Sequence, residues 1–282
     1  MCLEGSTMDA KIVKDLQDLS YLSWAKIRNS SGTAGSFLKA YDDLGGKKRY
    51  YKLSSYNVGE GIIGHESVNE IIADRLLTIL GIPHLEYHLI HADVVIDDLS
   101  YETYLCVSED FKKSGEGKIS LDTYFQAERN SGENLLDFCI RNGWEEYIYQ
   151  MLAADYLILN RDRHGANIEV LRNKRNKTIR LAPLFDHGLS LLFSSLSQEA
   201  LDKVDVMADT RVQCCIGTGS AFENLKLIPR DKMPVLNPLQ ESDEEILMFD
   251  LEDVLPEPWR KKIWEMIWGR WQVYESICNK GR

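Results

Sequence analysis

Apolar and polar residues alternate in the first third of the chain, and this pattern predicts β-strands. In a strand, successive side chains point to opposite faces, so a half-buried strand shows a period of two. Four segments follow this pattern: residues 37–41, 49–53, 84–92 and 101–107. The exception is residues 65–80, in which apolar residues recur every three or four positions until Gly81. This spacing is typical of an amphipathic helix that ends at glycine.

Helical spacing dominates the rest of the chain. Apolar residues recur every three or four positions in residues 135–139, in residues 147–157 and again in residues 258–277. The last segment carries four tryptophans, which we expect to pack its apolar face onto the other helices.

Two short apolar runs, residues 168–171 and 178–182, flank a charged turn and predict a β-hairpin within the helical part. The whole pattern predicts an α+β protein with a bilobal, protein-kinase-like fold. Residues 1–107 would form a small β-rich N-terminal lobe with one helix. Residues 108–282 would form a larger, mainly helical C-terminal lobe.

Composition narrows the range of functions. A hydrophobic content of 44% is ample for a packed core in a chain of 282 residues. The formal net charge of -11 argues against a surface that binds nucleic acid or an anionic membrane, because both need clustered positive charge. The sequence also shows no signal-peptide core, no apolar run long enough to span a membrane and no Cys-x-x-Cys spacing. We therefore expect a cytoplasmic protein with no membrane span and no direct contact with nucleic acid.

Two polar segments carry the candidate chemistry. Positions 160–167 read Asn-Arg-Asp-Arg-His-Gly-Ala-Asn, and Asp186 follows after the predicted hairpin. Phosphoryl transfer from ATP needs a carboxylate to orient the attacking hydroxyl and oxygen ligands for magnesium. We assign the first role to Asp162 and the second to Asn167 and Asp186. His164 either acts chemically or, as we prefer, orients Asp162 or the metal loop by hydrogen bonds. The alternative is a polar loop whose side chains only satisfy backbone groups.

An ATP site also needs a phosphate-covering loop, a cation and a carboxylate that holds the cation. The candidate loop is a turn of small residues whose amides can approach phosphates: Ser31, Gly32, Thr33, Ala34, Gly35 and Ser36. Lys52 is the predicted phosphate cation, with Lys39 as its competitor, whereas residues 47–49 are expected in a solvated turn. On the predicted helix, Glu70 is the preferred partner of Lys52, and Glu66 is better explained by the helix dipole.

These residues resemble the HipA family of bacterial kinases, whose catalytic loop has the form Asn-x-Asp-x-His-x-x-Asn followed by a metal-binding Asp. Asn160, Asp162, His164, Asn167 and Asp186 match this form position by position. The resemblance implies a protein-kinase-like fold, ATP and Mg²⁺ as cofactors, and phosphorylation of serine or threonine. It also implies autophosphorylation within the small-residue turn, a protein substrate, and an antitoxin-like or regulatory protein as partner.

The chain is compact for that family, because HipA toxins carry an additional subdomain before the phosphate loop and only 29 residues precede Ser30 here. The Asp-Arg-His triplet at 162–164 also resembles phosphoinositide kinases. A lipid or small-molecule kinase is therefore the alternative enzyme, and a catalytically silent, kinase-shaped binding module is the alternative without turnover.

Overall fold

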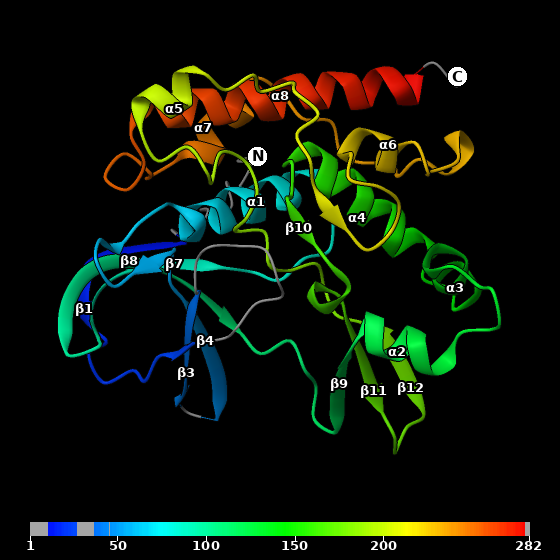
Figure 1. Ribbon diagram of the computed structural model, residues 1–282, viewed down its shortest axis with the longest axis horizontal. Coiled ribbons are helices and arrows are strands. Elements are labelled where there is room, and N and C mark those ends of the chain that lie inside the picture. Colours follow the sequence, from blue (N-terminus) through cyan, green and yellow to red (C-terminus); the bar gives the residue numbers. More distant parts are fainter. Residues whose placement is uncertain (1–10, 27–36, 45, 280–282) are drawn as a thin grey trace, which may run out of the picture. The chain divides into compact units, whose positions relative to one another are not determined.

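The computed structural model describes residues 11–26, 37–44 and 46–279 (Figure 1). The chain divides into two compact units. The first comprises Met1–Ile71 and Glu86–Asp110, and the second comprises Ile72–Leu85 and Phe111–Arg282. Residues 72–85 thus belong to the second unit, whereas the division expected from the sequence places them in the N-terminal lobe.

A six-stranded sheet forms the centre of the first unit. Its strands follow the order β1-β7-β8-β4-β3-β2. Only β1 and β7 run parallel; the other neighbours are antiparallel. The strand bounds are β1 (Ile12–Asp18), β2 (Ala25–Lys26), β3 (Leu38–Leu44), β4 (Lys47–Lys52), β7 (His88–Ile96) and β8 (Leu99–Glu109), and a separate short hairpin joins β5 (Tyr56–Asn57) and β6 (Gly61–Ile62). The predicted strands are present, and the apolar residues of one sheet face form the core, including Leu38, Leu53, Val94 and Leu105.

Two strand predictions need correction. Residues 84–87 lie outside β7, and His84 instead forms an isolated bridge to Leu184. The strand continues to Ile96, where Asp97 and Asp98 take left-handed φ angles of 50° and 63° and turn the chain into β8.

Residues 47–49 lie in β4 and not in a solvated turn. They pair with β3, where Lys48 lies opposite Asp43 and Arg49 lies opposite Asp42. Opposite charges across an antiparallel pair stabilise the strands, so a run of basic residues is compatible with this position.

Helix α1 (Glu66–Leu80) matches the predicted helix closely. Ile71, Leu76 and Leu77 are fully buried, and Gly81 ends the helix with a φ of 74°. A left-handed residue after the last turn is a common helix terminus, and glycine adopts this conformation without steric strain.

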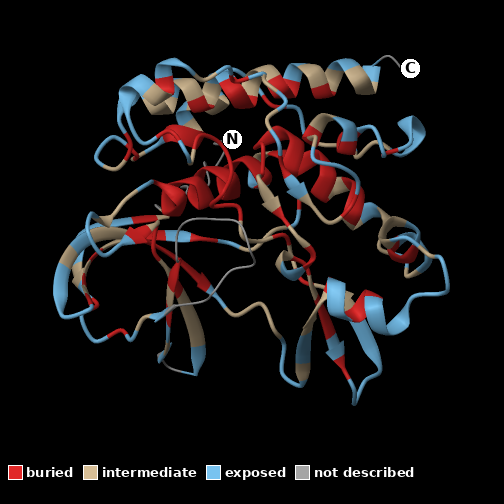
Figure 2. Cartoon of the chain, viewed as in Figure 1, coloured by how far each residue is buried: buried red, intermediate tan, exposed pale blue. Residues whose placement is uncertain are grey.

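The second unit is mainly helical. Its helices are α2 (Leu121–Glu128), α3 (Leu135–Arg141), α4 (Glu145–Leu157), α5 (Gln198–Asp202), α6 (Ala221–Leu225), α7 (Asp243–Met248) and α8 (Glu257–Asn279). Helix α4 is buried along most of its length (Figure 2) and contacts both α6 and α8. The predicted amphipathic C-terminal helix corresponds to α8, which buries Ile263, Ile267 and Trp271. None of the described helices combines the length and the hydropathy that a membrane crossing requires.

The predicted hairpin is confirmed as β11 (Glu169–Asn173) and β12 (Thr178–Leu181), with Val170 opposite Leu181. A third strand, β9 (Glu116–Ser120), pairs with the other edge of β11 and makes a three-stranded sheet. A short parallel pair joins β10 (Asp162–Arg163) to β13 (Gln213–Cys214). Two single turns of 3₁₀ helix complete the unit, η1 (Gly165–Asn167) and η2 (Arg230–Lys232).

Candidate active site

Residues 160–167 are called the catalytic segment after the role that the sequence predicts for them, and they begin directly after α4. Leu159 adopts a left-handed φ of 49° and turns the chain out of the helix. The amide of Arg161 then donates to the carbonyl of Leu189 at 2.8 Å, and the amide of Leu191 donates to Ile158 at 2.7 Å. These two bonds tie the start of the catalytic segment to the chain that follows Asp186.

Strand β13 holds the same segment from another direction. The amide of Gln213 donates to the carbonyl of Arg161, and the amide of Cys215 donates to the carbonyl of Arg163, each at 2.9 Å. The two accepting residues flank Asp162 in the sequence. Asp162 is therefore held by backbone hydrogen bonds on both sides.

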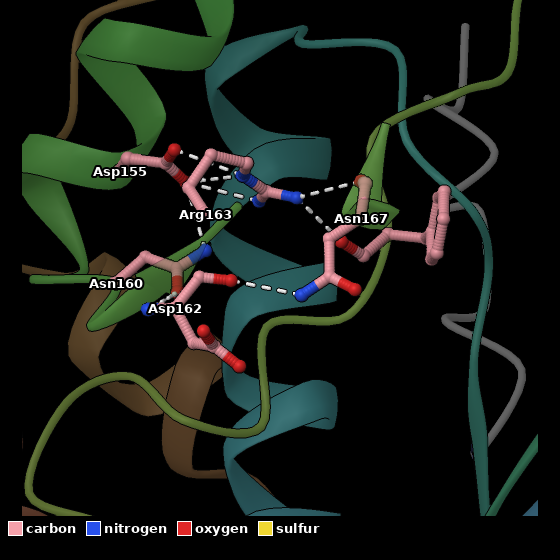
Figure 3. Close-up of polar contacts among 6 residues, drawn as sticks. Asp155, Asn160, Asp162, Arg163 and Asn167 are labelled. Carbon is pink, nitrogen blue, oxygen red and sulfur yellow. Dashed lines mark hydrogen bonds and ion pairs between the residues drawn. The ribbon is translucent and has the colours of Figure 1, made fainter. Parts of the chain in front are cut away.

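A buried ion pair lies beneath the segment. Arg163 is completely buried, and its guanidinium donates to both carboxylate oxygens of Asp155 in α4, with Nε to Oδ2 at 2.9 Å (Figure 3). Burial by itself lowers the pKa of Arg163, but the charge and hydrogen bonds of Asp155 outweigh burial and raise that pKa above its ordinary value. The guanidinium is therefore charged at neutral pH.

Arg163 also connects the two loops that carry the candidate metal ligands. Its Nη1 donates to the carbonyl of Phe185 at 2.8 Å and to the carbonyl of Asn167 at 3.3 Å. Asn167 is itself a predicted ligand, and Phe185 directly precedes Asp186. One fully buried side chain thus fixes the backbone at both positions.

Asn160 links the buried ion pair to Asp162. Its Nδ2 donates to Asp155 Oδ1 at 2.9 Å, and its Oδ1 accepts from the amide of Asp162 at 3.0 Å. The Asp162 carboxylate points away from the Asp155–Arg163 pair (Figure 3). It is therefore set apart from the structural ion pair and oriented by the backbone on which it sits.

The Asn167 side chain has a fixed orientation. Its Nδ2 donates to the carbonyl of Asp162 at 2.8 Å (Figure 3). Since only the amide nitrogen can donate to a carbonyl, the position of the other atom, Oδ1, is fixed as well. An amide oxygen is a ligand that hard cations such as magnesium accept.

Asp186 has a left-handed φ of 61°. Aspartate and asparagine tolerate this conformation better than most residues other than glycine. The preceding chain is anchored where the amide of Leu85 donates to the carbonyl of Leu184 at 2.8 Å. The backbone conformation at this position is therefore compatible with aspartate, whose carboxylate is the ligand expected from the sequence.

The side-chain oxygens of Asn167 and Asp186 suit magnesium better than they suit a metal that is held by protein ligands alone. Within the described part of the chain, no three His, Cys, Asp or Glu residues are grouped so that they could hold a metal ion. Magnesium is usually bound through one or two carboxylates together with substrate phosphates and water. Asn167 and Asp186 are the residues that would hold it.

His164 lies close to Asp162, but the contact is not a hydrogen bond. The distance from its Nε2 to Asp162 Oδ2 is 3.6 Å, which is within ion-pair range and beyond hydrogen-bond range. The orienting hydrogen bonds found at this segment come from Asn160 and Asn167. The expected role of His164 stays a prediction.

The nucleotide-binding candidates belong to the first unit. Lys52 Nζ lies 2.8 Å from Glu70 Oε1, and the Glu70 side chain is completely buried. This is the ion pair that strand and helix periodicity predicted. Glu66 instead accepts hydrogen bonds from the amide and the hydroxyl of Ser55. The small-residue turn at residues 31–36 lies outside the described residues.

The pairing of Arg163 with Asp155 was not predicted from the sequence. A signal was present for Asp155, because it is the only charged residue in an otherwise apolar run over residues 151–159. A lone charge in a buried helix needs a partner, and the nearest cations in sequence are Arg161 and Arg163. No sequence pattern indicates that β13 pairs with the catalytic segment, since residues 213–215 lie about fifty positions after it.

Comparisons with known proteins bear on the fold. No protein-family model and no curated protein matches the chain. Among solved structures, the crystal structure of a Helicobacter pylori proinflammatory kinase, CtkA, is similar to this chain. The TM-score is 0.58 at 14% identity, and the match covers 93% of this chain and 97% of that one. The HipA toxin–antitoxin complex of Shewanella oneidensis with HipB and operator DNA gives a TM-score of 0.41 at 16% identity, and the match spans 59% of that chain.

The likeness to CtkA shows the fold: this chain has the α+β, kinase-like architecture that its sequence predicted. The predicted kinase-like fold is thereby confirmed.

Proposed function

We propose that this protein is an ATP- and magnesium-dependent kinase that transfers the γ-phosphate to a serine or threonine hydroxyl of a protein. The observation that carries the proposal is that hydrogen bonds connect the backbone at all three candidate positions. Arg163 donates to the backbone of Asn167 and of Phe185, the neighbour of Asp186, while Asn167 donates to the carbonyl of Asp162. A loop that only satisfied its own backbone would not need a buried ion pair to align two segments.

Each residue has a distinct role in this proposal. The Asp162 carboxylate accepts a hydrogen bond from the acceptor hydroxyl and orients its oxygen toward the phosphate. Asn167 and Asp186 hold magnesium, which supplies charge neutralisation when bound. Lys52 contacts the phosphates of ATP, and Glu70 keeps the ammonium group in place. The two sets of residues belong to different compact units.

The acceptor and the partners follow from the resemblance. We propose a protein acceptor, with the small-residue turn at Ser31, Thr33 and Ser36 as a site of autophosphorylation. The HipA complex contains HipB and operator DNA, and by analogy we propose an antitoxin-like or regulatory protein as a partner of this chain.

The test is transfer of γ-labelled phosphate from Mg-ATP by the wild type and by Asp162→Ala, with the intact mass of the protein measured alongside. We expect label on wild-type protein or on an added protein substrate, and a loss of about a hundredfold or more in the variant. Asp231→Ala is the matched control, because Asp231 is exposed, and it should keep wild-type transfer.

The distribution of the label separates the alternatives. Label in an extractable lipid or small molecule would identify a different kinase class. Tight ATP binding with no transfer to any acceptor would contradict catalysis and indicate a binding module.

A further inference from the structure

Two neighbouring cysteines, Cys214 and Cys215, lie at the end of β13 and take no part in the proposed transfer reaction. Both residues are half-buried, and none of the described cysteines forms a disulfide. The two thiols are sequence neighbours and interact with each other. The interaction with Cys215 lowers the pKa of the Cys214 thiol, and the interaction with Cys214 raises the pKa of Cys215.

The pair is joined to the catalytic segment through the backbone. Cys214 lies opposite Arg163 in the parallel ladder, and the Cys215 amide donates to the Arg163 carbonyl at 2.9 Å. Cys214 also lines a small cavity together with Asp155 and Asn160. A change in this backbone therefore acts on the residue that directly follows Asp162.

We propose that Cys214 and Cys215 form a peroxide-sensitive dithiol, and that its oxidation to a disulfide between sequence neighbours releases β13 from the catalytic segment. The loss of phosphate transfer rests on the function proposed above. The oxidation and the release of β13 do not depend on that function.

The reaction balances with hydrogen peroxide as the oxidant. The Cys214 thiolate, the better nucleophile of the two, attacks one peroxide oxygen, and hydroxide leaves to give a sulfenic acid. The Cys215 sulfur then attacks the Cys214 sulfur, and water leaves as the S–S bond forms. The two thiol protons, together with the two hydrogens and two oxygens of the peroxide, end as two molecules of water. The two sulfurs are oxidised and the peroxide is reduced.

Ring closure acts on one particular backbone group. Neighbouring Cα atoms are about 3.8 Å apart, which is shorter than the roughly 4.4–6.8 Å usual for a disulfide. The peptide unit between Cys214 and Cys215 must therefore rotate to close the ring. The amide of that unit is the Cys215 N–H, the donor to Arg163. Strained disulfides are also the readily reduced kind, which suits a reversible regulator.

The first measurement is independent of catalysis. The full chain is treated with hydrogen peroxide, and the peptide containing both cysteines is analysed by mass spectrometry. We expect a loss of two hydrogens that dithiothreitol reverses, with faster hydrogen exchange at residues 213–215. Cys278→Ser, which changes a half-buried cysteine on α8, should show the same product, whereas Cys215→Ser should not.

The second measurement is the ratio of transfer activity after and before oxidation, taken for each protein separately. The ratio should fall about tenfold to a hundredfold in the wild type and in Cys278→Ser, because a displacement of about 1 Å in an active site can cost about a hundredfold. It should stay near one in Cys215→Ser, with Cys215→Ala as a second variant if the serine protein is unstable.

Separate sulfinic acids in place of the ring, or a ring with unchanged hydrogen exchange, would overturn the inference. Absence of transfer in untreated protein would instead refute the proposed function and leave the first measurement valid.

Discussion

At the level of single residues, Arg163 is a buried charge whose hydrogen bonds orient the backbone of nearby residues. Removing two charges from water costs several kcal/mol each, and a hydrophobic pair of the same size is often as stable. Stability alone therefore does not explain the Asp155–Arg163 pair. Its hydrogen bonds to the carbonyls of Asn167 and Phe185 give it a positioning role that an apolar side chain could not perform.

Replacing Arg163 with methionine should be strongly destabilising. The change leaves the Asp155 carboxylate buried without its cation, and we expect the free energy of unfolding to fall by about 3–5 kcal/mol. Urea denaturation followed by circular dichroism measures this. Arg175→Met, on the exposed turn between β11 and β12, is the matched control and should change stability by less than about 0.5 kcal/mol. Equal effects of the two substitutions would contradict the role of the ion pair.

Substitutions at Asp186 can separate the effect of its negative charge from the effect of its backbone conformation. Asparagine tolerates the left-handed φ of 61°, so Asp186→Asn should fold like the wild type and reduce transfer by orders of magnitude through loss of the carboxylate. Asp186→Ala should add about 1–2 kcal/mol of destabilisation from backbone strain. Transfer assays and thermal unfolding of both variants test this. Wild-type transfer by Asp186→Asn would exclude Asp186 as a magnesium ligand.

The sequence predicted some side-chain pairs and missed others for a physical reason. Lys52 and Glu70 each lie on a regular element, so periodicity indicates the face on which each side chain lies. Arg163 lies in a segment with no period, and its partners are contributed by α4 and by the loop at Phe185. Such contacts depend on tertiary structure, and local spacing does not specify them.

At the level of elements, the sheet β9-β11-β12 is joined by an ion pair between its strands. Arg180 in β12 donates to both carboxylate oxygens of Glu116 in β9, at 2.9 and 2.7 Å, and to the carbonyl of Phe111 at 3.1 Å. The hydrogen bonds from Arg180 hold the pKa of Glu116 below its ordinary value. The pair therefore links the start of the sheet to the hairpin that follows Asn167.

This ion pair should make stability depend on pH in a defined direction. A carboxyl group whose pKa is lower in the folded state stabilises the fold above its unfolded pKa, and that contribution is lost as the pH falls through the folded pKa. Glu116→Gln should destabilise the protein by about 1 kcal/mol at neutral pH and by less near about pH 3.

Urea denaturation at both pH values measures the difference. Glu199→Gln, which breaks an exposed pair with Lys203, is the control and should have little effect at either pH. A penalty for Glu116→Gln that does not change with pH would show that the carboxylate charge makes no contribution.

Element prediction succeeded where local pattern decides the structure. The hairpin β11–β12 and helices α1 and α8 each have a strong local pattern, and all three are present. Strand β9 was not predicted, because its pairing with β11 joins residues about fifty positions apart. The start of β4 was missed, because three consecutive basic residues indicate a solvated turn unless the acidic residues opposite them are known.

At the level of the whole molecule, binding of Mg-ATP should stabilise the fold. A ligand that binds only the folded state at about one hundred times its Kd adds about 2.7 kcal/mol to the free energy of unfolding. We expect the wild type to show a rise in its thermal unfolding temperature with Mg-ATP. The rise should be much smaller in Lys52→Met, measured against that variant's own temperature without ligand.

Two further variants make this test specific. Lys52→Met combined with Glu70→Gln avoids an unpaired buried carboxylate, so a lost response cannot be attributed to misfolding alone. Lys47→Met removes an exposed cation from the same strand and should keep the full response. An undiminished response in the double variant would exclude Lys52 from nucleotide binding.

Buried and exposed positions of the catalytic segment differ in how well they tolerate substitution. Asn160, Arg163 and Gly165 are buried, and a Cβ at Gly165 would collide with the Asp122 carboxylate. Ala166, in contrast, is exposed. During divergence, Ala166 can therefore change more freely than the buried residues, which keep the geometry of the segment constant. A library randomised at Ala166 should retain more folded members than one randomised at Gly165.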